Sequence, residues 1–342
     1  MTASLEPSAT VNSDARGRVP DFFVVGHAKS GTSALYEMLR RHPQVYMPDV
    51  KEPWYFVPEL RSGPKAANAE RHPHTLDGYL ALFAGAAPEQ RAGEATPSYL
   101  LSEHAAARIA ELQPDAKIVA ILREPASFLR SLHMQFLQTG VETERDLAKA
   151  IALEGRRREG NDIPSTSTRP QALLYSEHVR YVEQLRRYEQ QFGRERMLVL
   201  VYEDFRADNE GTVRRVLRFL GVDDTVAIEP TDVNPTVGVR APRVSGLVRS
   251  LYLGRGPGAR RAKRAIKALT PRRLRHEAIA IERRAQLGEP LELDERLMAE
   301  LRDRFAAEVA ALAEYLDRDM VELWGYDDFA RAAAAKARES AS

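Results

Sequence analysis

Apolar residues along this chain gather in short runs that alternate with stretches of helical periodicity. Residues 103–112 and 177–192 repeat apolar positions at helical spacing, and residues 293–324 do so again near the C-terminus. The runs that predict buried parallel strands are Phe22–Val25, Ala92–Ala95, Lys117–Leu122 and Met197–Tyr202. This alternation predicts an α/β fold in which a central parallel sheet is flanked by helices in three layers, with a helical C-terminal part.

Polar segments frame this pattern within the 342 residues. Residues 1–20 predict a disordered leader, residues 21–327 a single domain, and residues 328–342 a flexible tail. Inside the domain, Arg156–Pro170 is rich in Arg, Ser and Thr, and it predicts a mobile surface loop.

The turn that follows the first predicted strand favours anion binding. Gly26 and Gly31 have the spacing of a nucleotide phosphate loop, and a helical pattern begins at once after them. Backbone N–H groups and the positive end of the helix dipole would meet at this turn. Thr32, however, takes the place of the lysine that normally follows the second glycine, and Lys29 precedes it. The loop therefore suits a phosphate-like group, but not by the usual triphosphate arrangement.

A second candidate anion site follows the third predicted strand. That strand ends in Arg123, Pro125 can open the next helix, and Ser131 falls in the early turns of that helix. The guanidinium supplies a forked, permanent charge, and the hydroxyl supplies a neutral donor. Both sites, together with Thr96–Tyr99, lie at the carboxyl ends of predicted strands, where α/β sheets bind ligands.

Composition excludes several classes of protein. Cysteine is absent, which removes disulfides and thiolate chemistry and fits a reducing cytoplasm. The net charge of +1 gives no bias toward nucleic acid, and no apolar run approaches the about 18 residues that span a bilayer. His72, His74 and Asp77 lie close in sequence, but no further ligand has the right spacing, so we expect no metal site.

The two anion sites together resemble those of sulfotransferases that use 3′-phosphoadenosine 5′-phosphosulfate (PAPS). The stretch Lys29-Ser30-Gly31-Thr32-Ser33 matches the family's loop for the 5′-phosphosulfate, and Arg123, Pro125 and Ser131 match its 3′-phosphate pattern. Residues 198–205 and 219–222 are similar to the bacterial branch. The resemblance spans about residues 21–326 and implies a P-loop-like fold with PAPS as co-substrate. It also implies that Tyr175, Arg240 and Arg243 lie near the nucleotide.

The resemblance also implies the chemistry of the site. Lys29 would stabilise the charge that develops on the leaving phosphate, while Gly31, Thr32 and Ser33 cradle that phosphate. Glu52, in Lys51-Glu52-Pro53-Trp54-Tyr55-Phe56, resembles the base of carbohydrate-type members.

The base has an alternative in Glu94, within Gly93-Glu94-Ala95-Thr96-Pro97-Ser98-Tyr99. In that segment Ala95 stands where many carbohydrate-type members carry a second lysine. Pro97 stands about where phenol and steroid types carry a histidine base, so a histidine mechanism is not expected. His27, inside the phosphate loop, is open to two interpretations: it lines the acceptor pocket or it packs the loop.

Other functions and partners stay open from the sequence. A small-molecule kinase that uses Mg-ATP is one alternative, with Val199–Asp204 as the strand that ends in a metal-holding acid, and a non-catalytic nucleotide-binding protein is another. The expected acceptor is a carbohydrate, lipid-linked or secondary-metabolite alcohol. Residues 240–284 carry fourteen basic and two acidic residues, which suit either a solvated face or contact with an anionic ligand or membrane surface.

Overall fold

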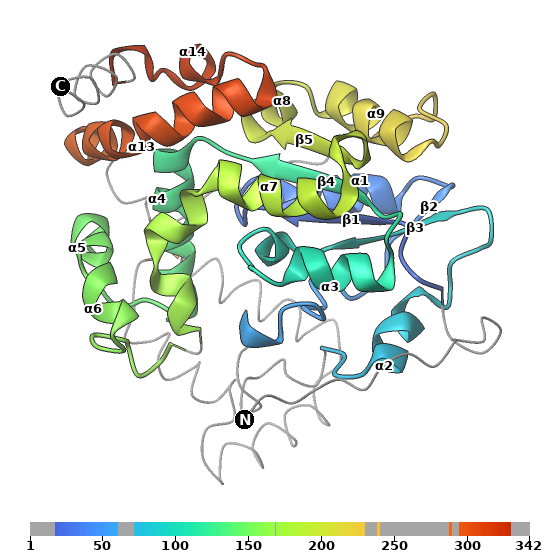
Figure 1. Cartoon of the computed structure of the whole chain (residues 1–342), viewed down its shortest axis with the longest axis horizontal. Helices are drawn as coiled ribbons and strands as arrows, with labels where there is room; N and C mark the ends of the chain where they lie inside the picture. Colours follow the sequence, from blue (N-terminus) through green and yellow to red (C-terminus); the bar gives the residue numbers. More distant parts are fainter. Residues whose placement is uncertain are drawn as a thin grey trace, which may run out of the picture.

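A five-stranded parallel sheet forms the centre of the molecule, in the order β2-β3-β1-β4-β5 (Figure 1). The computed structural model describes residues 18–60, 72–167, 169–229, 238–239, 287–288 and 294–329. The strands are β1 (Phe22–Gly26), β2 (Val45–Tyr46), β3 (Arg91–Ala95), β4 (Lys117–Leu122) and β5 (Met197–Val201). The four predicted strands are therefore confirmed. The two-residue β2 is too short to leave an apolar run in the sequence.

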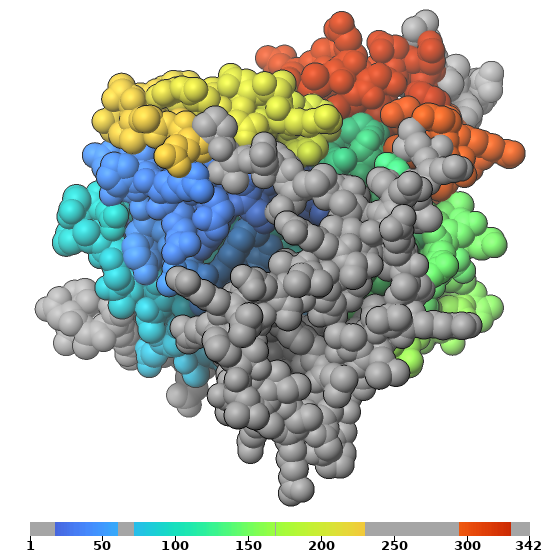
Figure 2. All heavy atoms as spheres, turned by 180° about the vertical axis from the view of Figure 1, so that it is seen from behind, coloured from blue at the N-terminus to red at the C-terminus, as the bar shows by residue number. Residues whose placement is uncertain are grey.

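Helices cover both faces of the sheet, so every β1 residue is buried. Phe23 and Val25 belong to the larger core cluster, on the face packed by α3 (Ala105–Leu112) and α7 (Tyr181–Phe192). Phe22 and Val24 point into a second cluster under α1 (Thr32–Arg40) and α9 (Asn209–Leu220). Figure 1 shows α3 and α7 crossing one face, and Figure 2 shows, from behind, the blue N-terminal segment beside the yellow α8–α9 segment. The three-layer α/β prediction is confirmed.

The remaining elements surround this three-layer core. The other α-helices are α2 (Leu76–Leu80), α4 (Pro125–Thr139), α5 (Leu147–Ala152), α6 (Glu154–Arg158), α8 (Tyr202–Ala207), α13 (Glu295–Leu316) and α14 (Met320–Trp324). Short 3-10 helices are η1 (Pro58–Leu60), η3 (Ala81–Phe83), η4 (Pro97–Tyr99), η5 (Pro170–Leu173), η6 (Tyr175–Val179) and η7 (Arg194–Arg196). An antiparallel pair, β6 (Gly238–Val239) and β7 (Leu287–Gly288), completes the described elements.

The C-terminal helices fasten the end of β4. Helix α13 packs on α4 and α7, as the helical pattern of residues 293–324 predicted. The Tyr326 hydroxyl donates to Glu124 at 2.6 Å, and Glu124 in turn caps the start of α4 by accepting from the N–H groups of Ala126 and Ser127. The first turn of α4, which follows Arg123, is thus held in place from the other end of the chain.

The segment predicted as a surface loop is partly internal. Helix α6 takes up its first residues, and the Arg157 side chain is 1% exposed. Arg157 pairs with Glu142, which is fully buried, at 2.8 Å. The surface prediction was therefore wrong at Arg157, because a buried carboxylate draws this arginine inward.

Several predictions concern residues outside the described ranges. These are Arg240, Arg243, the basic segment 240–284, and most of the leader and of the tail. The domain boundaries after residues 20 and 327 stay predictions for the same reason.

Candidate active site

The two glycines of the phosphate-type loop allow close approaches that no other residue would. Gly26 has φ +132°, and a Cβ there would lie 2.3 Å from the Ile121 carbonyl oxygen on β4. Gly31 has φ +83°, and a Cβ there would lie 2.8 Å from the Phe205 ring. Gly31 also precedes α1, whose first N–H groups have no side-chain cap. The backbone of the loop is thus close to β4 and α8, and the uncapped N–H groups at the start of α1 suit an anion.

Lys29 and Arg123 lie together in this cradle. Arg123 Nη1 donates to the Lys29 carbonyl at 2.8 Å, and its guanidinium lies 4.7 Å above the Tyr202 ring. Burial and the charge of Arg123 lower the pKa of Lys29. Ser30 Oγ and Arg123 Nε are buried with no hydrogen-bond partner in the described part of the chain. Two converging cations and two unused polar atoms fit an anionic ligand.

Ser131 follows on the helix that Arg123 precedes. Pro125 begins α4, as predicted, and Ser131 is a buried residue in the second turn of that helix. Both parts of the predicted 3′-phosphate pattern therefore stand at the carboxyl end of β4, next to the loop after β1.

Glu52 and Glu94, the two candidate bases, have different surroundings. Glu52 N–H bonds to the Ala95 carbonyl at 3.2 Å, and its carboxylate pairs with Lys51 at 2.7 Å and stays 36% exposed. Glu52 lines a cavity beside the loop. Glu94 is fully buried instead, where it accepts from the hydroxyls of Tyr79 and Thr96, and it does not line that cavity.

Burial raises the pKa of Glu94 to about 7, so the stability of the fold is expected to decrease as the pH rises. The unfolded chain releases this proton near the ordinary value of 4.5, whereas the folded protein keeps it up to about pH 7. The folded state therefore binds more protons than the unfolded state between these pH values. The contribution of Glu94 to the free energy of unfolding is lost as the pH approaches 7. At about 1.4 kcal/mol per pKa unit, the loss is about 3 kcal/mol.

Glu94→Gln is expected to remove this part of the pH dependence. Denaturant unfolding of both proteins at pH 5 and pH 8 measures it. An equal change in unfolding free energy in wild type and variant would show that Glu94 does not hold the proton.

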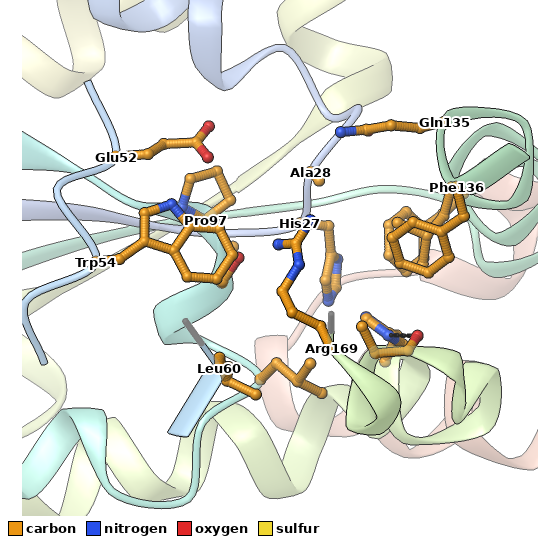
Figure 3. A pocket seen from close by; sticks show the side chains of 16 residues that line it. His27, Ala28, Glu52, Trp54, Leu60, Pro97, Gln135, Phe136 and Arg169 are labelled. Carbon is orange, nitrogen blue, oxygen red and sulfur yellow. Dashed lines mark hydrogen bonds between the residues drawn. The ribbon is translucent and has the colours of Figure 1, made fainter. Parts of the chain in front are cut away.

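The cavity beside the loop has a volume of about 140 Å³ and gathers side chains from distant segments (Figure 3). Glu52 and Trp54 stand on one side and Gln135 and Phe136 of α4 on the other, with Arg169 between them. Apolar side chains make much of the wall: Leu60, Pro97, Leu101, Phe128, Leu132 and Ala172. Glu52 is thus brought to the same cavity as the loop residues His27 and Ala28.

His27 serves both interpretations that the sequence left open. It lines the cavity and packs between the rings of Phe128 and Tyr181, with both ring centroids 4.5 Å away. Burial and the nearby His178 lower its pKa to about 3, and burial lowers that of His178 to about 4. Both imidazoles are therefore neutral near pH 7.

Two other candidates from the sequence, Tyr175 and His72, contact neighbouring residues of the fold. Tyr175 is fully buried, its hydroxyl lies 3.2 Å from Glu142, and it does not line the cavity. His72 Nδ1 lies 3.2 Å from the Pro53 carbonyl. Across the residues that the structure describes, no cluster of His, Cys, Asp or Glu is arranged to hold a metal. No helix there is long and apolar enough to span a bilayer.

Trp54, Gln135, Arg169 and His178 line the cavity, yet they were not predicted as site residues. Trp54 lies two residues after Glu52 in the same segment, so its closeness to Glu52 in the sequence could have indicated a place at the site. Arg169 had none, because its segment resembles an ordinary polar loop.

Comparisons with known proteins extend these observations. The model of the sulfotransferase family matches residues 20–225, more than half of the 342 residues. The chain belongs to the sulfotransferase family. The crystal structure of a sulfotransferase from Alicyclobacillus acidocaldarius superposes with a TM-score of 0.62 at 26% identity, covering 90% of this chain and 99% of that one. The two proteins therefore share the sulfotransferase fold.

Curated sulfotransferases are similar over a smaller part. Mouse heparan sulfate glucosamine 3-O-sulfotransferase 3A1 is 28% identical over 221 residues, which cover 65% of this chain and 50% of the relative. Human heparan sulfate glucosamine 3-O-sulfotransferase 6 is 29% identical over 246 residues, covering 71% of this chain and 64% of the relative. The chain thus spans about half to two-thirds of the length of these relatives.

Proposed function

We propose that this protein transfers the sulfuryl group of PAPS to an acceptor hydroxyl. The observation that carries the proposal is the direct contact between the two predicted phosphate sites, since Arg123 bonds the backbone of Lys29. A ligand with one anion on each site matches a nucleotide with phosphates at both 3′ and 5′ positions. The family and its curated relatives support the same activity.

Each residue has a role that follows from its surroundings. Bound PAPS supplies an activated sulfuryl group on its 5′-phosphate. Lys29, with its ammonium half-buried beside Arg123, stabilises the charge that develops on that phosphate as the group leaves. Ser30, Thr32 and Ser33 bind phosphate oxygens at the start of α1, and Arg123 with Ser131 binds the 3′-phosphate.

Glu52 is the proposed base. It faces the cavity, keeps part of its carboxylate exposed, and is ready to accept the proton of an acceptor hydroxyl. Glu94 is held by two hydroxyls in the core and meets no such space. The structure therefore supports Glu52 over Glu94 as the residue that contacts the acceptor.

The acid that a kinase would need to hold magnesium is already paired with an arginine. Asp204, the acid at the end of Val199–Asp204, is gripped by both Nη atoms of Arg318 at 2.6 and 2.8 Å. Both carboxylate oxygens are thus engaged in a two-pronged ion pair. This pairing argues against magnesium coordination at Asp204.

We infer that the acceptor is a carbohydrate or a related alcohol, as the printed names of the curated relatives suggest for those proteins. We also place the protein in the cytoplasm, which the absence of cysteine supports.

Thermal melting with nucleotides tests the proposal. Adenosine 3′,5′-bisphosphate at 100 times its Kd is expected to stabilise the protein by about 3 kcal/mol without Mg²⁺. Transfer of labelled sulfate from PAPS to an alcohol then shows turnover. Protection by Mg-ATP alone would favour the kinase, and protection without turnover of any alcohol would favour a binding protein.

A further inference from the structure

Polar atoms without partners gather at the cavity beyond the phosphate loop. In the described part of the chain, three residues that line this cavity each have a buried side-chain atom without a hydrogen-bond partner: His27 Nδ1, Gln135 Oε1 and Arg169 Nε. Buried polar groups are nearly always hydrogen-bonded, because leaving one unpaired is costly. Such a cluster in a cavity indicates that a polar ligand completes the bonding.

Arg169 has the most to gain from a ligand. Its Cζ lies 4.9 Å from the centroid of the Trp54 ring, and Figure 3 shows the guanidinium rising between Trp54 and His27 into the centre of the cavity. No carboxylate of the described residues forms an ion pair with it, although Glu52 lines the same cavity. Burial lowers the pKa of Arg169, while the charge of Glu52 opposes this effect. A half-buried cation that forms no ion pair with a described carboxylate favours an anionic ligand.

Backbone geometry shows that this arrangement is maintained at a cost. The non-glycine residues with positive φ in the described chain are Lys29, Glu52, Trp54, Asp162 and Asp317. The first three of them line or adjoin the site. Trp54 has φ +58°, a conformation that costs an aromatic residue on the order of 1 kcal/mol or more. The chain thus accepts strain in a conformation that places the indole beneath the guanidinium.

The start of η5 fixes Arg169 from the other side. Pro170 is the first residue of η5, and the Ala172 N–H bonds to the Arg169 carbonyl at 3.1 Å. Ala95, whose methyl group belongs to the core cluster under α1, brings no charge to the acceptor side. Among the described residues that line this cavity, Arg169 is therefore the one lysine or arginine.

We propose that Arg169, held on the indole of Trp54, binds an oxyanion on the acceptor side of Glu52. The inference rests on the proposed function in taking this cavity for the acceptor's. The ligand is a carboxylate or sulfate type of group. It belongs either to the acceptor, which is then an acidic alcohol, or to the sulfuryl group as it passes to the acceptor.

A binding experiment tests the site without any transfer reaction. The chain has two tryptophans, so Trp324→Phe leaves Trp54 as the fluorescent reporter. With saturating adenosine 3′,5′-bisphosphate on the phosphate sites, sodium sulfate is titrated against sodium chloride at constant ionic strength. We expect a saturable change in Trp54 emission with sulfate alone. Arg169→Gln is expected to abolish the change and Arg169→Lys to weaken it at least threefold.

Arg194 offers a matched control, since its guanidinium stacks on the Tyr315 ring at 4.4 Å on the surface. Arg194→Gln should leave the sulfate response unchanged. A sulfate response that survives in Arg169→Gln, or is absent from the parent protein, would overturn the proposal. Loss of adenosine 3′,5′-bisphosphate binding in Arg169→Gln would also overturn it, because the arginine would then support the fold as a whole.

Kinetics with two matched alcohols separate the two sources of the oxyanion. Methyl glucuronide and methyl glucoside differ at C6, which is a carboxylate in the first and a hydroxymethyl group in the second, and both serve as acceptors for labelled PAPS. If the acceptor carries the anion, Arg169→Gln raises KM for the glucuronide at least tenfold and leaves the glucoside unchanged. If the sulfuryl group is the ligand, kcat falls equally with both. Unchanged constants for both would contradict the proposal, whereas a wild type that binds sulfate but never uses PAPS refutes the proposed function alone.

Discussion

Lys29→Ala is expected to lower kcat on the order of 10³-fold and to raise the Kd of adenosine 3′,5′-bisphosphate by less than about tenfold. In the proposed mechanism the ammonium acts on charge that appears only as the sulfuryl group leaves, so the free energy of the transition state should change far more than that of the bound nucleotide. The other proposed phosphate-binding groups, which are Arg123, Ser131 and the N–H groups of the loop, are unchanged in this variant. Alanine keeps a Cβ, so the strain at φ +66° is the same in both proteins.

Single-turnover rates with labelled PAPS and calorimetric titration with adenosine 3′,5′-bisphosphate measure the two effects separately. Lys149→Ala is the matched control, since Lys149 is an exposed lysine on α5, and it should leave both values unchanged. Lys29→Arg keeps the charge and should recover part of the rate. Comparable losses of rate and of nucleotide affinity in Lys29→Ala would reduce Lys29 to a binding residue.

Glu52→Gln is expected to lower kcat by about 10²–10⁴-fold, the usual contribution of a positioned base. Glutamine has the same shape as glutamate, so the backbone strain at φ +57° is the same in both proteins. Steady-state rates with labelled PAPS measure the loss. Binding of adenosine 3′,5′-bisphosphate should stay as in wild type.

The same assay on Glu94→Gln separates the two candidate bases. Glu94 is expected to affect stability more than turnover, because its carboxyl is enclosed by Tyr79 and Thr96. Glu89→Gln changes an exposed glutamate before β3 and provides the neutral reference. Full activity in Glu52→Gln together with a large loss in Glu94→Gln would reverse the assignment.

Much of the fold could be predicted because its signals are local. Strands such as Phe22–Val25 and Lys117–Leu122 are buried on both faces, so they read as continuous apolar runs. The phosphate-type loop was equally visible, since Gly26 and Gly31 are required by contacts that nothing larger could make. Pro125 marked the start of α4 in the same way.

The acceptor side could not be predicted, because it depends on contacts between distant segments. Arg169 contacts Trp54 across more than a hundred residues, and no motif marks Arg169 in the sequence. Arg157 was expected at the surface because its partner, Glu142, is identified only by the fold. The hydroxyls that enclose Glu94 were likewise not identifiable from the sequence. Charge alone does not say which arginine is enclosed.

The position of β1 in the sheet also bears on how the chain folds. Strand β1 comes first in the sequence, yet it pairs on one side with β3 and on the other with β4, whose residues begin about seventy and ninety-five positions later. Such distant pairings close large loops, which makes folding slow relative to helical proteins. The phosphate-type loop, which is proposed to bind the nucleotide, follows the end of β1 and contacts Ile121 of β4 through Gly26. Nucleotide binding should therefore appear late during refolding, after β1 has paired with β3 and β4.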